Sequence, residues 1–224
     1  MSWTNERCQR MRAFAARFSI AEIRSLSSCQ TLAAVLLIAA SSPTLPAQSQ
    51  PAPRPGPEIV LTLDPAQSTV HFTVGSTLHA VHGTFAFKSG AIHFDPDTGK
   101  AGGEFVVDTA SGESGDDSRD MRMKKEILEA PKFPEIIFHP TQVEGKVDPS
   151  GASDVKLHGI FSIHGADHEI TATVHAQLTG DRWNATANFD VPYIAWGIKN
   201  PSNFFLKVKP VVNVDLEMSG HESP

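Results

Sequence analysis

From Val70 onward, apolar residues recur at every second position along most of the chain. In residues 170–178, Ile, Ala, Val, Ala and Leu alternate with Thr, Thr, His and Gln. A period of two sends successive side chains to opposite faces of a β-strand. Similar alternation occurs in residues 70–74, 81–87, 105–107, 155–163, 183–191 and 206–218. We therefore predict an all-β protein with half-buried strands.

Turn-forming residues separate these alternating segments. Gly, Asp and Pro tolerate or impose the backbone angles that hairpins require, and they occur in residues 95–99, 148–151, 165–167 and 179–181. Strands joined by hairpins pair antiparallel, and eight or nine of them in sequential order favour closure, because a closed barrel leaves no unpaired edge. We predict an antiparallel up-and-down barrel of about eight strands, with an open sandwich as the alternative.

Residues 118–130 interrupt the period of two. Met123, Ile127 and Ala130 recur at helical spacing among strong helix formers. Asp116, Asp117 or Ser118 is a suitable N-cap, and the prolines after Ala130 stop a helix. This segment predicts one short helix that caps an end of the barrel.

The predicted inward positions combine large aromatic side chains with small ones, among them Gly83, Gly159, Ala172 and Ala185. An eight-stranded barrel is just wide enough to be filled by side chains or to hold one small ligand. Small inward residues would leave room for a ligand, whereas large and small residues can also interdigitate in a solid core. The sequence leaves both possibilities open.

The N-terminus has the order of an export signal. Five arginines precede the apolar run 32–40, and a candidate cleavage region follows at residues 45–47. About ten apolar residues are too few to span a bilayer. We predict a signal peptide over residues 1–47, a Pro-rich linker over 48–57 and a barrel domain over 58–219, in a periplasmic or secreted mature chain without a transmembrane segment.

Two details of this leader stay open. Met1 and Met11 are both possible starts. Residues 26–29 imitate a lipoprotein acylation box at Cys29, but the apolar run follows that cysteine instead of preceding it, so we expect no lipidation.

Charge and cysteine content exclude several function classes. Outside residues 1–47 the chain has 14 basic and 23 acidic residues, which argues against a nucleic-acid partner. Both cysteines, Cys8 and Cys29, lie in the leader. The predicted domain therefore has no thiol for redox chemistry, disulfides or metal binding.

Five ordered sequence segments resemble the YceI-like family across nearly the whole span from Leu63 to Leu216. They are Phe-Thr-Val at 72–74 with Val-His-Gly-Thr-Phe at 81–85, Ser-Gly-Ala-Ile-His-Phe-Asp-Pro at 89–96, Ser-Arg-Asp at 118–120, Lys-Phe-Pro-Glu-Ile-Ile-Phe at 132–138, and Gly-Ile-Phe-Ser-Ile-His-Gly at 159–165. Each segment alone is an ordinary strand or turn, and the specificity lies in their order.

The resemblance implies a lipocalin-like barrel, exported to the periplasm, whose apolar cavity holds a polyisoprenoid such as an isoprenoid quinone or a polyprenyl lipid. It implies no catalytic residues and no cofactor besides the bound lipid. Two departures concern the cavity mouth: the segment between Phe72 and Gly83 is a residue shorter than the family pattern, and residues 191–197 replace the family's Asn-Arg-x-Asp-Phe-Gly-like turn.

We predict that ligand-binding residues are inward strand residues, the apolar face of the helix and the aromatic residues near the last loop. They are Phe72, Val74, Val81, Phe85, Phe87, Phe105, Met123, Ile127, Phe161, Ile163, Ala172, Val174, Trp183, Phe189, Tyr193, Trp196, Phe204 and Phe205. Tyr193, Trp196, Phe204 and Phe205 are assigned to the rim or the lining because Gly197 and Pro201 mark a loop.

Arg119 has two possible roles, contact with a ligand head group or an ion pair with a carboxylate. Adjacent residues on a helix do not face each other, so we expect Arg119 and Asp120 to serve different neighbours. Asp108, Glu113, Asp116, Asp117 and Asp120 form an acidic cluster, which we interpret as helix capping and solvation, with weak cation binding as the alternative.

The sequence gives little indication of a metal site or of a hydrolase active site. Zinc needs three or four converging ligands, and we interpret His79, His82, His158, His164 and His168 as solvent-facing strand residues without a metal. No Gly-x-Ser-x-Gly elbow marks a nucleophile. Two function classes remain: a non-enzymatic lipid carrier with no identifiable protein partner, and a solid-cored barrel that works through its surface.

Overall fold

The computed structural model describes residues 58–148 and 150–223, and nine strands make up most of this part of the chain. They are β1 (Ile59–Leu63), β2 (Thr69–Ser76), β3 (Ala80–Phe94), β4 (Ala101–Asp108), β5 (Glu135–Glu144), β6 (Ala152–Ile163), β7 (Ala166–Thr179), β8 (Arg182–Val191) and β9 (Val208–Ser223). The predictions for residues 1–57, including the signal peptide, the linker and Cys29, lie outside the described residues.

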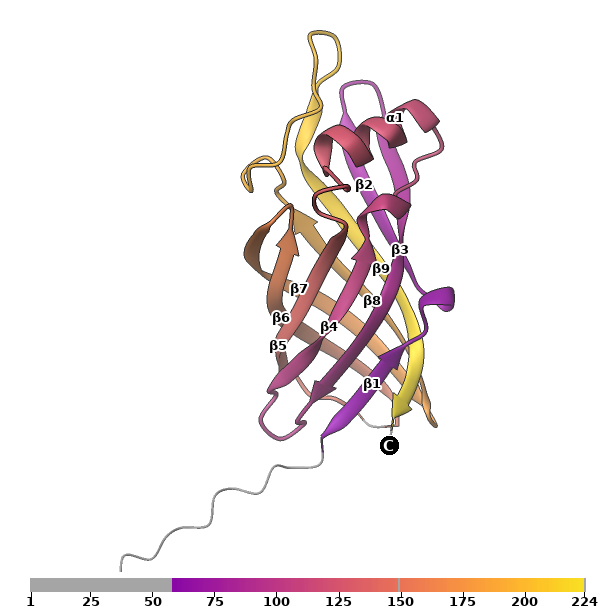
Figure 1. Cartoon of the computed structure of the whole chain (residues 1–224). Helices are drawn as coiled ribbons and strands as arrows, with labels where there is room; N and C mark the ends of the chain where they lie inside the picture. The colour runs from indigo at the N-terminus through magenta and orange to yellow at the C-terminus, as the bar shows by residue number, and fades with distance from the viewer. Residues whose placement is uncertain (1–57, 149, 224) are drawn as a thin grey trace, which may run out of the picture. The chain divides into compact units, whose positions relative to one another are not determined.

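The strands form one closed antiparallel barrel (Figure 1). Each strand from β2 to β9 pairs with the next along the chain, and β9 closes the ring on β2. Strand β1 pairs with both β3 and β9, as β2 does, and a short 3₁₀ turn, η1 (Pro65–Gln67), separates it from β2. β1 and β2 therefore share one of eight positions, and the predicted up-and-down barrel is confirmed.

Burial follows the alternation of the sequence. In β8, Trp183, Ala185 and Ala187 are buried, whereas the residues between them are exposed. The residues of β7 and β9 that pair with them also point into the barrel, because directly paired residues lie on the same face of a sheet. Burial of each apolar side chain on the inner face stabilises the fold by about 1.5–3 kcal/mol. A slip of one residue in register would turn all the inward side chains of a strand to solvent, so the register is strongly specified.

Two inward glycines create space for neighbouring rings. Gly83 pairs with Phe72, and Gly159 lies beside Phe138 on the adjacent strand. A Cβ at either glycine would collide with the aromatic ring opposite it. The expectation that inward glycines leave room for a ligand is therefore wrong at these two positions.

The predicted helix is present but changes type part-way along. A second short 3₁₀ turn, η2 (Thr109–Ser111), follows β4 and leads to it. α1 (Asp117–Arg122) is an α-helix, and it continues as the π-helix η3 (Met123–Ile127). The carboxylate of Asp116 accepts the backbone N–H of Arg119 at 2.9 Å, which confirms the predicted N-cap. The expected single helix over 118–130 is too long, because residue propensities do not distinguish an α-turn from a π-turn.

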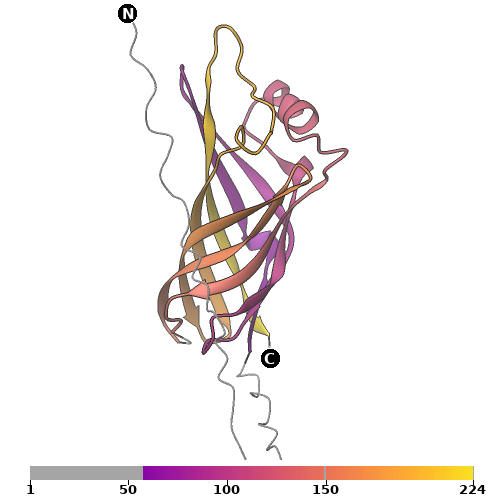
Figure 2. The same ribbon diagram turned by 90° about the vertical axis from the view of Figure 1, so that its left-hand side faces the viewer.

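The two ends of the barrel differ in what covers them. At one end, here called the helix end, lie the β2–β3 hairpin, the β4–β5 connection with α1 and η3, and the β8–β9 loop (Figures 1 and 2). The far end has the short turns β3–β4, β5–β6 and β7–β8. None of the helices in the described ranges is long and apolar enough to cross a membrane.

Candidate functional site

A cavity of about 620 Å³ lies inside the barrel. Most of its lining consists of apolar side chains from the inner faces of the strands, and most of the rest comes from α1, η3 and the loops at the helix end. The inner space is therefore not filled by interdigitating side chains, and the question that the sequence left open is answered in favour of a cavity.

Fifteen of the predicted ligand-binding residues line this cavity. They are Phe72, Val74, Val81, Phe85, Phe87, Phe105, Met123, Ile127, Phe161, Ile163, Ala172, Val174, Trp183, Phe189 and Tyr193. Arg119 lines it as well. Their position is established by the structure, and their contact with a ligand stays a prediction.

Three predicted residues do not line the cavity. Trp196 stacks on the ring of His168, with ring centroids 4.0 Å apart and an interplanar angle of 5°. Phe204 and Phe205 are 88% and 86% exposed. The β8–β9 loop extends beyond the barrel wall (Figure 2). Trp196, Phe204 and Phe205 therefore take the rim position, one of the two predicted for them, whereas Tyr193 of the same loop lines the cavity.

Sequence reasoning missed the contribution of β5. Ile136, Phe138 and Val143 all line the cavity. Phe138 and Val143 are an odd number of residues apart, so a regular strand would place them on opposite faces. The register shifts between Pro140 and Gln142, which turns Val143 inward in place of Gln142. A bulge of this kind breaks the period of two, although Ile136 and Phe138 alone show the alternation that would have indicated this strand.

The far end of the cavity is closed by tightly buried side chains. Leu178, Trp183 and Met218 are 3%, 4% and 7% exposed. Ser153, a polar residue in this region, accepts the backbone N–H of Asp148 at 2.8 Å, so its hydroxyl is satisfied within the protein.

Polar lining gathers at the helix end. Ser76, His79, Ser114, Ser118, Arg119 and Arg122 border the cavity there. Apolar lining residues of this end, such as Val74, Val81 and Leu206, are only half-buried. The cavity thus has an apolar closed end and a polar mouth, the arrangement expected for a ligand with a long apolar body and a small polar head.

Arg119 is held in place at this mouth by Ser114. Its Nε donates to the hydroxyl of Ser114 at 2.7 Å, and its Nη2 donates to the carbonyl of the same residue at 2.7 Å. Among the residues that the structure describes, no carboxylate forms an ion pair with this guanidinium. The carboxylate pairing that we considered for Arg119 is therefore absent from the described part of the chain.

Asp120 contacts the same serine, which corrects the expectation of different neighbours. The Ser114 hydroxyl and backbone N–H both donate to the Asp120 carboxylate. Burial alone raises the pKa of Asp120, but the Ser114 hydrogen bonds and the nearby Lys124 and Arg119 charges outweigh it, so the pKa lies below its ordinary value. The loop carrying Ser114 folds back over the helix start, where both side chains reach it.

Two buried donors in the lining have no hydrogen-bond partner among the described residues. They are the hydroxyl of Tyr193 and the indole N–H of Trp183. Burial raises the pKa of Tyr193, so its hydroxyl stays protonated at neutral pH and can donate. A buried donor without a partner costs free energy, and a polar group of a ligand would satisfy it.

The sequence matches the YceI-like domain over residues 61–219, which is most of the chain. The chain belongs to the YceI-like family. A search of curated proteins gives no match.

Solved structures share the fold of this YceI-like chain. BcnA of Burkholderia cenocepacia is 16% identical with a TM-score of 0.59, over 70% of this chain and 98% of its own. A polyisoprenoid-binding domain from Saccharophagus degradans, implicated in plant cell wall breakdown, is 16% identical with a TM-score of 0.53, over 73% and 98%. The YceI protein of Campylobacter jejuni is 20% identical with a TM-score of 0.51, over 64% and 86%.

The histidines of this YceI-like barrel occupy separate environments. His82 lies 3.0 Å from the Thr73 hydroxyl, and His164 lies 3.4 Å from a Glu129 oxygen. His168 points inward, because it pairs with Phe161, and the expectation that it faces solvent is wrong. The described residues contain no group of three or more His, Cys, Asp or Glu side chains arranged to hold a metal ion.

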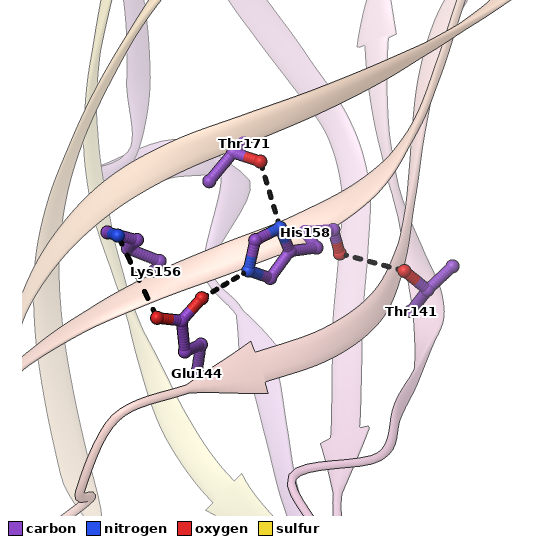
Figure 3. Close-up of polar contacts among 5 residues, drawn as sticks. All are labelled: Thr141, Glu144, Lys156, His158 and Thr171. Carbon is purple, nitrogen blue, oxygen red and sulfur yellow. Dashed lines mark hydrogen bonds and ion pairs between the residues drawn. The ribbon is translucent and has the colours of Figure 1, made fainter.

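One polar network on the outer face has the order carboxylate, imidazole, hydroxyl (Figure 3). Glu144 lies 2.9 Å from Nε2 of His158, and the Thr171 hydroxyl lies 2.8 Å from Nδ1. The hydrogen bond from His158 and the charge of Lys156 lower the pKa of Glu144. These side chains are solvent-exposed and separated from the cavity by the sheet, so we interpret them as a cross-strand ladder.

Proposed function

We propose that this protein binds, carries or stores an apolar isoprenoid lipid, such as an isoprenoid quinone or a polyprenyl chain, without catalysing a reaction. The observation that carries the proposal is the apolar cavity of about 620 Å³ with a polar mouth. Its volume is in the range of pockets that hold one small-molecule ligand. Family membership and the polyisoprenoid-binding neighbour support lipid binding in general.

The alternative, a solid-cored barrel that acts through its surface, is less well supported. It requires inward side chains that fill the barrel, whereas Ala172, Ala176, Ala185 and Ala187 border open space. Side chains of that size leave a channel along β7 and β8 that an extended chain would occupy.

We further propose that the chain is exported and then processed near Ala47, because the arginine-rich start, the short apolar run and the small-residue region follow in the order of a signal peptide. N-terminal sequencing of the processed protein tests this, and recovery of uncleaved cytoplasmic protein or acylation of Cys29 would contradict it.

Filling the cavity should remove the lipid. Ala172 and Ala185 face inward on β7 and β8 and are 3% and 8% exposed. In Ala172→Trp and Ala185→Phe, the new ring would occupy the channel, so we expect loss of co-purified lipid. Native mass spectrometry of the freshly purified protein, followed by organic extraction, measures the bound lipid.

Thr173→Trp is the matched control, because Thr173 precedes an inward residue on the same strand but points outward. We expect this variant to keep its lipid. Circular dichroism checks that each variant is folded, since overpacking a filled core costs about 1–3 kcal/mol. Absence of lipid from the parent protein together with no uptake of an added isoprenoid, or equal lipid content in all variants, would contradict the proposal.

A further inference from the structure

Three large apolar side chains are exposed together at the helix end. Leu78 at the tip of the β2–β3 hairpin is 76% exposed, and Phe204 and Phe205 in the β8–β9 loop are 88% and 86% exposed. Single exposed apolar residues are common on soluble proteins, but a contiguous group of them marks an interaction surface.

The hairpin and the loop form one surface because they are hydrogen-bonded to each other. The backbone N–H of Thr77 donates to the carbonyl of Lys207 at 2.9 Å, and Ser76 pairs with Val208. The aliphatic stem of Lys209 lies against Gly75 in the hairpin. Figure 1 shows both tips projecting from the end of the barrel that carries α1.

The two phenylalanines are held outward by an ordered turn. The side-chain oxygen of Asn203 accepts the backbone N–H groups of Phe205 at 2.9 Å and Leu206 at 2.7 Å. Leu206 turns toward the cavity, whereas the rings of Phe204 and Phe205 lie edge to face with centroids 5.2 Å apart and remain in solvent. The turn therefore presents a fixed aromatic pair beside the mouth of the cavity.

The two segments that carry the exposed apolar residues contain basic but no acidic side chains, although the chain as a whole is acidic, with a formal net charge of -6. Residues 192–209 contain Lys199, Lys207 and Lys209 and no acidic residue, and residues 75–80 contain no acidic residue either. Lys199 pairs with Glu126 of η3 at 3.6 Å. Lys207 and Lys209 follow the aromatic turn in the chain and are exposed.

We propose that Leu78, Phe204, Phe205, Lys207 and Lys209, here called the tip patch, dock this protein on the surface of an anionic lipid bilayer. Aromatic rings favour the interface between headgroups and acyl chains, and lysines near the surface are attracted by anionic headgroups. The mouth of the cavity lies at the same end, so docking would direct it toward the lipid. This inference goes beyond the proposed function, because docking does not require a bound ligand.

Flotation with lipid vesicles tests the tip patch. The wild-type protein should float with vesicles of phosphatidylethanolamine and phosphatidylglycerol and bind vesicles of phosphatidylcholine more weakly. In Phe204→Ser/Phe205→Ser, partitioning onto the anionic vesicles should fall by about tenfold or more, because the inserted area is lost. Lys207→Glu/Lys209→Glu should abolish the preference for anionic lipid.

Lys100→Glu/Lys146→Glu is the matched control, since it makes the same change in net charge at turns of the far end. This variant should partition within about twofold of the wild type, because distant charges are screened. All proteins share the same N-terminal residues, so differences between variants arise from the substituted positions. Lipid content, measured in solution without vesicles, reports separately on the proposed function.

Three outcomes would overturn the proposal. The first is wild-type binding that no tip-patch substitution weakens, and the second is no vesicle binding at all. The third is a concentration-dependent dimer, measured by light scattering, that Phe204→Ser/Phe205→Ser dissociates, which would assign the tip patch to a second copy of the chain.

Discussion

At the residue scale, the mouth of the cavity depends on a shared hydrogen-bonding partner. Ser114 donates to Asp120 and accepts from Arg119, so the carboxylate fixes the serine and the serine fixes the guanidinium. The sequence identified both charged residues but assigned them to different neighbours, because helix geometry alone does not reveal a loop that folds back over the helix start. Arg119 is therefore positioned before any ligand arrives.

Tyr193 offers the sharpest residue-level test of ligand contact. Its buried hydroxyl lines the cavity without a partner among the described residues. Tyr193→Phe should leave the lipid-free protein equally or more stable, because an unsatisfied buried donor costs about 1–3 kcal/mol. Affinity for an isoprenoid with a polar head should fall by roughly threefold to tenfold, as one hydrogen bond is lost. Titration with a fluorescent isoprenoid measures it.

An isoprenoid hydrocarbon that lacks the polar head is the control ligand for Tyr193. Tyr193→Phe should bind it as the wild type does, since the ring remains. If Tyr193→Phe lowers the affinity for both ligands equally, the hydroxyl acts through packing, and the hypothesis that it donates to the ligand is wrong.

At the element scale, the sequence predicted the strands well and the connections poorly. The alternation in β6, β7 and β8 predicted their inward faces, because the inward residues of each strand are mostly buried or half-buried and the residues between them are mostly exposed. The alternation did not reveal the inward face of β5, because the bulge after Pro140 changes which residues of this strand point inward. The π-helix and the position of the aromatic loop depend on tertiary contacts, which local patterns do not encode.

The π-helix η3 places Met123 and Ile127 on the cavity while Met121, on α1, is 55% exposed. If η3 covers the mouth, Met123→Ser/Ile127→Ser should accelerate release of a bound fluorescent isoprenoid, since most affinity changes within one site appear in the dissociation rate. Stopped-flow transfer to acceptor vesicles measures that rate.

Met121→Ser is the control for this experiment, because it removes an apolar side chain from the same segment without touching the cavity. It should release the lipid at the wild-type rate. A loss of several kcal/mol in unfolding free energy for the double variant, with an unchanged release rate in its folded fraction, would make η3 part of the core instead of a gate.

At the scale of the whole molecule, a closed barrel separates stability from binding. Hydrogen bonds between neighbouring strands hold the barrel wall together. Closure of the barrel therefore does not require side chains that fill its interior, and small side chains can border the cavity. The sequence predicted the barrel, and fifteen of the eighteen predicted ligand-binding residues line its cavity. It could not decide between cavity and core, because that depends on how the volumes of facing side chains add up across the barrel.

A ligand in this cavity should therefore stabilise the folded state by mass action. At a lipid concentration of about 100 times the dissociation constant the gain is about 2.7 kcal/mol, which raises the melting temperature by roughly 5–10 °C for a domain of this size. Differential scanning calorimetry before extraction, after extraction and after return of the lipid measures the shift. Ala172→Trp, whose cavity is filled, should melt at the same temperature in all three states. A wild-type protein that also melts unchanged through extraction and return would mean that the cavity does not hold the lipid.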